Sequence, residues 1–157
     1  MTKHGNDATF ELAFAPCARL VSVVSEFYAE VLEDADLTSR LALATHEMLE
    51  NSSRYSIDEK TSLRIDVTTR AGTTVVTVTT KNRADAPNLA ALRVTLDEVI
   101  AAPDPQAHYL VLMRRTAKRT DGSGLGLGRV RAESEMDLSY VIDGNLVVLR
   151  AETRWTT

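Results

Sequence analysis

Alternate positions in Asp121-Gly122-Ser123-Gly124-Leu125-Gly126-Leu127-Gly128-Arg129-Val130-Arg131 hold four of the seven glycines of the chain. Glycine tolerates a positive φ and lets other groups approach the main chain, so this spacing predicts a loop whose N–H groups face an anion. The next residues, 129–136, are expected to continue as a helix whose N-terminus also favours negative charge. The stretch therefore predicts a phosphate-binding loop, and a loop without a ligand is an equal alternative on this feature alone.

The residues exclude two common phosphate loops. No Gly-Lys-Ser or Gly-Lys-Thr ending is present, so the stretch is not a Walker A loop. A dinucleotide-binding fingerprint needs Gly-x-Gly-x-x-Gly or Gly-x-Gly-x-x-Ala. The sixth residue is Leu127 when counted from Gly122 and Arg129 when counted from Gly124, so neither frame fits.

The composition is that of a soluble globular protein, with 157 residues of which 44% are hydrophobic and 25% charged. We expect a single domain over 1–157, with the polar segment 1–7 disordered. A net charge of −4 argues against nucleic acid as the main partner. Cys17 is the only cysteine, which excludes an intrachain disulfide. No apolar run is long enough for a membrane span, and we expect a cytoplasmic protein without membrane contact.

Apolar periodicity and turn residues predict the secondary structure. The expected order is a strand at 9–14, a helix at 19–32, a helix from a cap at Asp36 or Thr38 to Tyr55, a hairpin of 61–69 and 73–80, a loop at 81–87, helices at 89–100 and 109–116, the glycine loop with its helix, and a hairpin of 137–142 and 146–151. Helices between hairpins indicate an α/β (α+β) two-layer sandwich. The expected sheet is mixed and largely antiparallel, with helices covering one face.

Glu47 and Asn51 lie four residues apart on the second predicted helix, so both side chains project from one face. An amide oxygen can bind Mg²⁺, and a carboxylate can orient or deprotonate a hydroxyl group or water. The pair therefore predicts a metal–phosphate site. A solvent-facing polar couple is the alternative.

Taken together and in this order, the helix with Glu47 and Asn51 and the later Gly122-Ser123-Gly124-Leu125-Gly126-Leu127 resemble two motifs of the GHKL superfamily, the N box and the second glycine box. Proteins of that superfamily have the Bergerat fold, which binds ATP. The resemblance covers nearly all of the chain. Since the chain has about the length of that domain alone, it is most similar to the stand-alone anti-sigma-factor serine kinases and to the SiaB-like kinases.

The resemblance implies roles for the matching residues. Asn51 would bind a Mg²⁺ ion that bridges the ATP phosphates, and Glu47 would be the base or orienting group for the attacking hydroxyl. The main chain of the second glycine box would wrap the phosphates, through Gly122, Ser123, Gly124, Leu125, Gly126 and Leu127. ATP and Mg²⁺ are therefore the expected cofactors.

The resemblance also implies an activity and a partner. The chain would be a serine/threonine protein kinase or regulator of a bacterial partner-switching pathway. Its partner would be a small protein that resembles an anti-sigma-factor antagonist, with a sigma factor as a further candidate. A homodimer is left open.

One motif of the family is missing. The first glycine box, Asp-x-Gly-x-Gly, carries the acid that reads the adenine amino group, and the matching stretch here is Lys81-Asn82-Arg83-Ala84-Asp85. Asn82 would take the place of that acid as a neutral amide, or Asp85 would reach in from further along. The alternative hypothesis is therefore a degenerate GHKL-fold binding module that regulates a partner by contact, without nucleotide chemistry.

Overall fold

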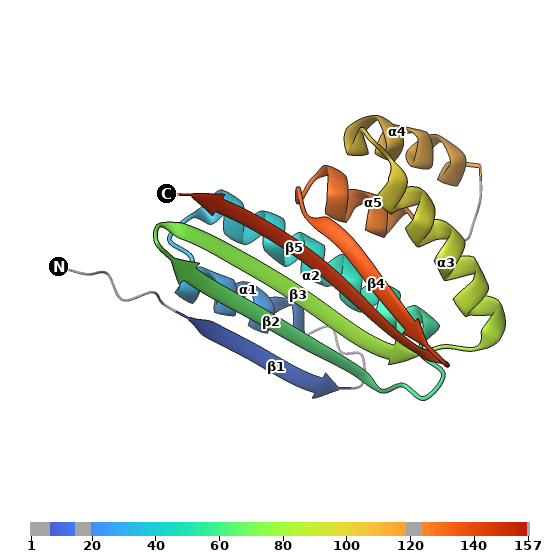
Figure 1. Cartoon of the computed structure of the whole chain (residues 1–157), viewed down its shortest axis with the longest axis horizontal. Helices are drawn as coiled ribbons and strands as arrows, with labels where there is room; N and C mark the ends of the chain where they lie inside the picture. Colours follow the sequence, from blue (N-terminus) through green and yellow to red (C-terminus); the bar gives the residue numbers. More distant parts are fainter. Residues whose placement is uncertain (1–6, 15–19, 119–123, 157) are drawn as a thin grey trace.

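The computed structural model describes residues 7–14, 20–118 and 124–156, which form five strands and five helices (Figure 1). In chain order these are β1 (Ala8–Phe14), α1 (Leu20–Val31), α2 (Ala35–Tyr55), β2 (Thr61–Arg70), β3 (Thr73–Arg83), α3 (Ala86–Ala101), α4 (Pro105–Thr116), α5 (Leu125–Ala132), β4 (Asp137–Asp143) and β5 (Leu146–Thr156). Apart from Asp7, the segment expected to be disordered lies outside the described residues.

The strands form one sheet in the order β1-β2-β3-β5-β4. Ala71 and Gly72 join β2 to β3, and both have the positive φ that a two-residue hairpin turn requires. A second hairpin joins β4 to β5, and the two hairpins meet through the antiparallel pair of β3 and β5. The sheet was expected to be mixed. All pairings between the described strands are instead antiparallel, because each hairpin fixes its own strands and β3 runs opposite to β5.

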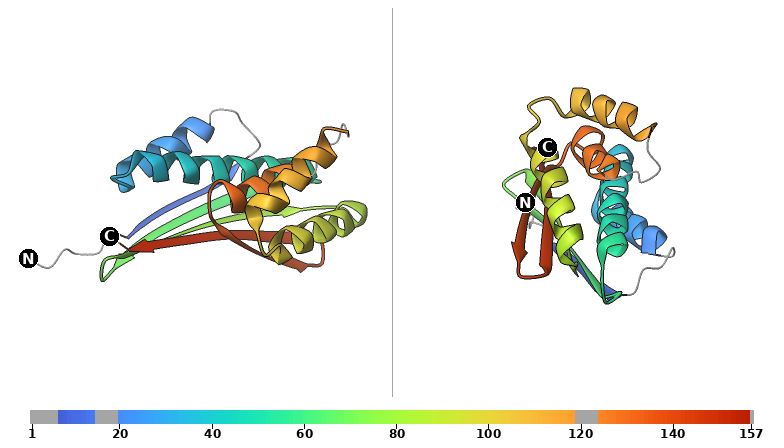
Figure 2. Two further views of the ribbon diagram at one scale, coloured as in Figure 1. Left: turned by 90° about the horizontal axis from the view of Figure 1, so that it is seen from above. Right: turned by 90° about the vertical axis from the view of Figure 1, so that its right-hand side faces the viewer.

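Alternation along the strands gives the sheet one apolar and one polar face. In β2, Leu63, Ile65 and Val67 are buried. Arg64 and Asp66 lie on the opposite face, where the Arg64 Nε is 2.8 Å from the Asp66 Oδ2. The helices cover the apolar face only (Figure 2). The predicted two-layer sandwich with a largely antiparallel sheet is therefore confirmed.

Helix α2 is the longest helix and crosses the middle of the sheet (Figure 1). It begins after Asp34, whose side chain accepts a hydrogen bond from the Leu37 N–H at 2.9 Å, so the predicted caps at Asp36 or Thr38 are wrong. Leu41, Ala44 and Met48 are fully buried. Burial of a leucine or methionine side chain contributes about 1.5–3 kcal/mol, so this face anchors the helix.

Two predicted boundaries are wrong in ways that affect the site. The loop expected at 81–87 is strand as far as Arg83, because Lys81, Asn82 and Arg83 pair with residues of β5. The helix expected at 129–136 begins earlier, at Leu125, and ends at Ala132. Part of the glycine stretch is therefore helix rather than loop.

The other expected elements are present with shifted ends. Helix α4 begins at Pro105 rather than at 109, with the Asp104 side chain accepting a hydrogen bond from the Ala107 N–H. Strand β5 continues to Thr156, beyond the expected end at 151, because it pairs with the whole of β3.

Tyr28 of α1 contacts α2 in the buried core. Its side chain is fully buried, and its hydroxyl lies 2.7 Å from the Thr45 Oγ1. Thr45 itself donates to the Leu41 carbonyl at 2.8 Å, so its only hydrogen is engaged and the Tyr28 hydroxyl must be the donor. Burial raises the pKa of Tyr28 far above its ordinary value of 10.0.

We predict that Tyr28→Phe lowers the free energy of unfolding by about 1 kcal/mol at neutral pH, because a buried hydrogen bond is lost. The folded protein binds the phenolic proton more tightly than the unfolded chain does. The stability from this difference is complete below pH 10.0, the ordinary pKa, and is lost as the pH rises above it. Urea unfolding on both sides of that pH should show a smaller alkaline loss in Tyr28→Phe than in the wild type. Equal losses would contradict the assignment.

Candidate functional site

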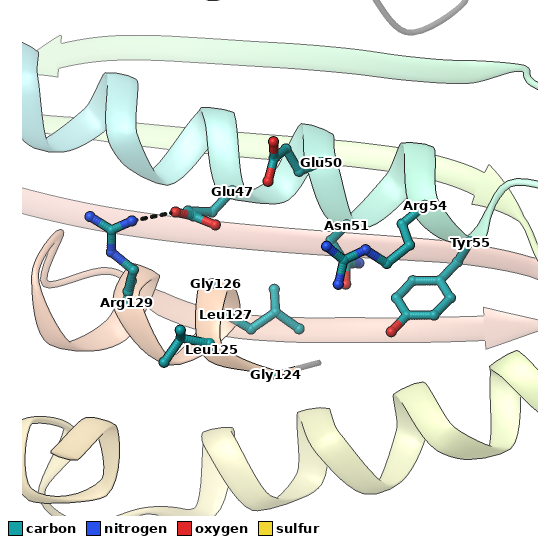
Figure 3. Close-up of a pocket in the computed structure, with 10 residues that line it drawn as sticks. All are labelled: Glu47, Glu50, Asn51, Arg54, Tyr55, Gly124, Leu125, Gly126, Leu127 and Arg129. Carbon is teal, nitrogen blue, oxygen red and sulfur yellow. Dashed lines mark hydrogen bonds and ion pairs between the residues drawn. The ribbon is translucent and has the colours of Figure 1, made fainter. Parts of the chain in front are cut away.

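A pocket lies between one side of α2 and the beginning of α5 (Figure 3). Ten residues line it: Glu47, Glu50, Asn51, Arg54 and Tyr55 of α2, and Gly124, Leu125, Gly126, Leu127 and Arg129. The two separated motifs of the sequence therefore face one another. The cavity volume is about 200 Å³. Pockets for whole ligands commonly span about 300–1,000 Å³, so this cavity has room for a polyphosphate group rather than an entire nucleotide.

Helix α2 supplies one wall of the pocket because its other side is buried on the sheet. Glu47 and Asn51 lie on the same face, as their spacing predicts. Glu50, Arg54 and Tyr55 also line the pocket, although the motifs of the sequence predict no role for them. The sequence could have indicated Arg54 and Tyr55, because they follow Asn51 by three and four residues. This spacing places them one turn further along the same side of the helix.

The first turn of α5 supplies the opposite wall. Gly124 is its N-cap in the left-handed conformation, with φ of 86°, and no side chain of a described residue caps this end. The first N–H groups of a helix have no partner within the helix, so an uncapped N-terminus favours an anion. Leu125, Gly126 and Leu127 form this turn, whereas Gly122 and Ser123 lie outside the described residues.

Packing explains three glycines of the stretch. A Cβ atom on Gly126 would overlap the Glu47 carboxylate, and one on Gly128 would come within 2.6 Å of a Leu112 methyl group. A Cβ on Gly124 would lie 2.9 Å from the Thr95 methyl group. The alternate spacing therefore lets α5 approach α2, α3 and α4 closely, a requirement that holds whether or not an anion binds.

Glu47 forms an ion pair with Arg129 across the pocket. The Arg129 Nη1 donates to the Glu47 Oε1 at 2.8 Å, and Figure 3 shows the two side chains turned toward each other. The Glu47 side chain is only 12% exposed, and that of Arg129 is 33% exposed. No local sequence pattern indicates this partner, because the two residues lie 82 positions apart.

The two candidate adenine-reading residues lie outside the pocket lining. Asp85 is the N-cap of α3, where its carboxylate accepts a hydrogen bond from the Asn88 N–H at 2.9 Å. Asn82 is only 3% exposed and lies on the helix-facing side of β3. Its Nδ2 atom has no hydrogen-bond partner in the described part of the chain.

Three hydroxyl groups share this property with Asn82. Ser52 Oγ, Thr61 Oγ1 and Thr80 Oγ1 are buried and make no hydrogen bond within the described residues. Thr61 is the register partner of Asn82, Thr80 precedes Asn82 by two positions on the same face, and Ser52 follows Asn51 on α2. Buried polar groups without partners are costly, so this end of the core suits a polar ligand group or water.

The donor set of the pocket fits a metal-bound polyphosphate. No group of three or more histidine, cysteine or acidic residues that could hold a metal ion occurs among the described residues. A Mg²⁺ ion would therefore need oxygens from a ligand in addition to the Asn51 amide. Glu47 and Glu50 would repel a bare phosphate, and a divalent cation would offset that repulsion.

In the described segments, no helix combines the length and apolar character that crossing a membrane requires.

We predict that Gly126→Ala lowers the free energy of unfolding by about 1–2 kcal/mol, because displacing the ion-paired Glu47 carboxylate outweighs the better helix propensity of alanine. In a Glu47→Ala background the obstacle is absent, and the same change should be neutral or stabilising by up to about 1 kcal/mol. Urea unfolding of the four proteins measures both effects. A similar loss in both backgrounds would show that Glu47 is not what requires the glycine.

Comparisons with known proteins bear on the fold. No protein-family model matches the chain, and no curated protein matches it. The chain is similar to a chain in the crystal structure of the SiaB-SiaC complex from Pseudomonas aeruginosa, with a TM-score of 0.61 and 9% sequence identity. The similarity covers 93% of this chain and 89% of the other. At that identity the similarity establishes a shared fold alone.

Proposed function

We propose that this protein is an ATP-dependent serine/threonine protein kinase of a bacterial partner-switching pathway. The observation that carries the proposal is the pocket, where Glu47 and Asn51 of α2 face the first turn of α5. A carboxylate and an amide on one wall, with the N–H groups of a helix N-terminus on the other, are the parts that phosphoryl transfer needs, since the protein mainly positions and neutralises in such reactions.

Each wall has its own part in binding. The N–H groups of the first turn of α5 would donate to phosphate oxygens, and the Asn51 amide oxygen would bind Mg²⁺. Arg54 adds a positive charge on the same wall as Asn51 and would pair with a terminal phosphate. Bound ATP would supply the phosphoryl group to be transferred.

Glu47 is the candidate base or orienting group. It lies one turn before Asn51 and is largely shielded from water, so its carboxylate would meet an incoming hydroxyl group close to the metal. A serine or threonine hydroxyl of a partner protein is the acceptor in this proposal. The cavity has room for the phosphate groups of ATP, which supports the part of the proposal that concerns the reacting phosphates.

The buried polar groups beside β3 support a place for the base of the nucleotide. Asn82 would act as a neutral amide in place of an acid, and the hydroxyls of Ser52, Thr61 and Thr80 would supply further hydrogen bonds. Asp85 is a weaker candidate, because its carboxylate already caps α3. Because Asn82 does not line the pocket, the adenine base would have to extend beyond the cavity to reach it.

The proposed partner is a small protein that resembles an anti-sigma-factor antagonist, and a sigma factor is a second candidate. The support is the similar fold of a chain found in the SiaB-SiaC complex. A homodimer is compatible with the exposed Val21 and Val23 of α1.

The alternative function is regulation by contact without a nucleotide. Two observations favour it: packing already explains three glycines, and neither Asn82 nor Asp85 lines the pocket. Under this alternative, Glu47 and Arg129 would only fasten α5 to α2.

We predict that a non-hydrolysable ATP analogue binds the wild type in a Mg²⁺-dependent manner in calorimetric titrations. Asn51→Ala should weaken binding in the presence of Mg²⁺ by at least about tenfold, because a metal ligand is lost. Without Mg²⁺, the variant and the wild type should bind equally weakly. Asn88→Ala is the matched control, because it removes an amide outside the pocket.

The titration separates the two functions. Absence of binding by the wild type at millimolar analogue would refute the kinase proposal and favour regulation by contact. Binding that does not depend on Mg²⁺ or on Asn51 would refute the metal assignment.

A further inference from the structure

We propose that Arg129 is a positioning residue that fixes the carboxylate of Glu47 for phosphoryl transfer. The inference rests on the proposed kinase function for its reaction, and on the contacts of α2 and α5 for its geometry. The GHKL resemblance of the sequence assigned no role to Arg129.

The first observation is the direct contact. The Arg129 Nη1 lies 2.8 Å from the Glu47 Oε1, and the Glu47 side chain is 12% exposed. A charge-assisted hydrogen bond in such a shielded place is stronger than one in water. Glu47 has three rotatable side-chain bonds, and this contact selects one arrangement among them.

The second observation is that Arg129 is itself held from the other side. Its Nη2 and Nε lie 3.2 and 3.3 Å from the Oε2 of Glu133, the C-cap residue of α5. Arg129 therefore lies between two carboxylates, with a planar guanidinium group that contacts both at once. Glu133 is 40% exposed, so it fastens the arginine near the surface while Glu47 lies deeper.

The third observation is the steric limit on Glu47. Gly126 lies against the Glu47 Oε2, so the carboxylate meets the main chain of α5 with one oxygen and Arg129 with the other. Gly126 leaves space for the Glu47 carboxylate, and the ion pair with Arg129 keeps the carboxylate in that space. Both oxygens are thus placed by α5, the helix whose first turn faces the same pocket.

Tyr109 extends the cluster to α4. Burial raises the pKa of Tyr109, and the negative charge of Glu133 adds to that effect. The tyrosine therefore stays protonated beside Glu133.

A function in catalysis follows from the arrangement. A carboxylate that must meet a hydroxyl group beside a metal-bound phosphate works only within a narrow range of positions. Loss of Arg129 would leave Glu47 in place but free to rotate. The reaction should therefore slow, while nucleotide binding, which depends on the other pocket groups, should persist.

The first test measures nucleotide binding and single-turnover conversion of Mg-ATP to ADP separately, with water as the acceptor. Arg129→Gln should lower the conversion rate by about 100-fold while the Kd for Mg-ATP changes much less, because small misplacements of a reacting group have effects of that size on the rate. Arg129→Lys should regain part of the conversion rate, since an ammonium group can still reach Glu47. It cannot contact Glu133 at the same time, so the recovery should be incomplete.

The control is Arg150→Gln. Arg150 also forms an ion pair, with 2.6 Å between its Nη2 and the Glu152 Oε2, but on the outer face of the sheet away from the pocket. This variant should keep the wild-type rate. A wild-type rate in Arg129→Gln, or no recovery in Arg129→Lys, would overturn the positioning role while the kinase function stood. Failure of the wild type to bind and convert Mg-ATP would overturn the kinase function, and the positioning role with it.

The second test needs no nucleotide. The free energies of unfolding of Glu47→Gln, Arg129→Gln and the double variant, measured in urea, form a double-mutant cycle. The loss in the double variant should be clearly smaller than the sum of the two single losses, because each single change leaves one charge without its partner. Additive losses would show that the two side chains do not hold each other, and would overturn the inference.

Discussion

The structure depends on the long helix α2, which packs on the hydrophobic core with one side and lines a polar pocket with the other. One side of α2 buries Leu41, Ala44 and Met48 against the sheet, while Glu47 and Asn51 face α5. Because side chains on a helix are fixed relative to one another, the packing of the apolar side also fixes where the polar side points. The polar wall of the pocket therefore has the rigidity of the hydrophobic core. The opposite wall, by contrast, belongs to a short helix that contacts α2 through small residues and an ion pair.

The glycine-rich stretch has two physical explanations that do not exclude each other. Gly124 adopts a left-handed conformation and has no side chain with which to cap the first turn of α5, which suits an anion. Gly126 and Gly128 lie within the helix and permit close approach to Glu47 and Leu112. At Gly126 and Gly128 the absence of a Cβ gives neighbouring side chains room, whereas the backbone conformation there does not require glycine. A phosphate ligand and a tightly packed α5 therefore require the same residues, and only binding measurements distinguish the two requirements.

Local patterns predicted most of the fold, and long-range contacts account for the differences. The four-residue spacing of Glu47 and Asn51 was enough to place them on one wall. The start of α5 at Leu125 was not predictable from helix propensity, since glycine disfavours a helix interior and only packing compensates. Likewise Lys81, Asn82 and Arg83 look like a loop until β5 pairs with them. Arg129 was missed because its partner lies on another helix, and no local pattern reports such a pairing.

The strand order also has a consequence for how the protein folds. β2 and β3, and β4 and β5, are joined by tight turns, so each hairpin closes a short loop. The central pair of β3 and β5 joins Arg83 to Leu146 and Thr73 to Thr156, with α3, α4 and α5 between them in the chain. Distant pairings form slowly because loop closure costs entropy before contacts repay it. The two hairpins should therefore gain amide protection before β3 and β5 join, and pulsed hydrogen exchange showing all strands protected at once would contradict this order. The polar wall on α2 and the glycine-rich wall on α5 would then meet only after the two hairpins have formed.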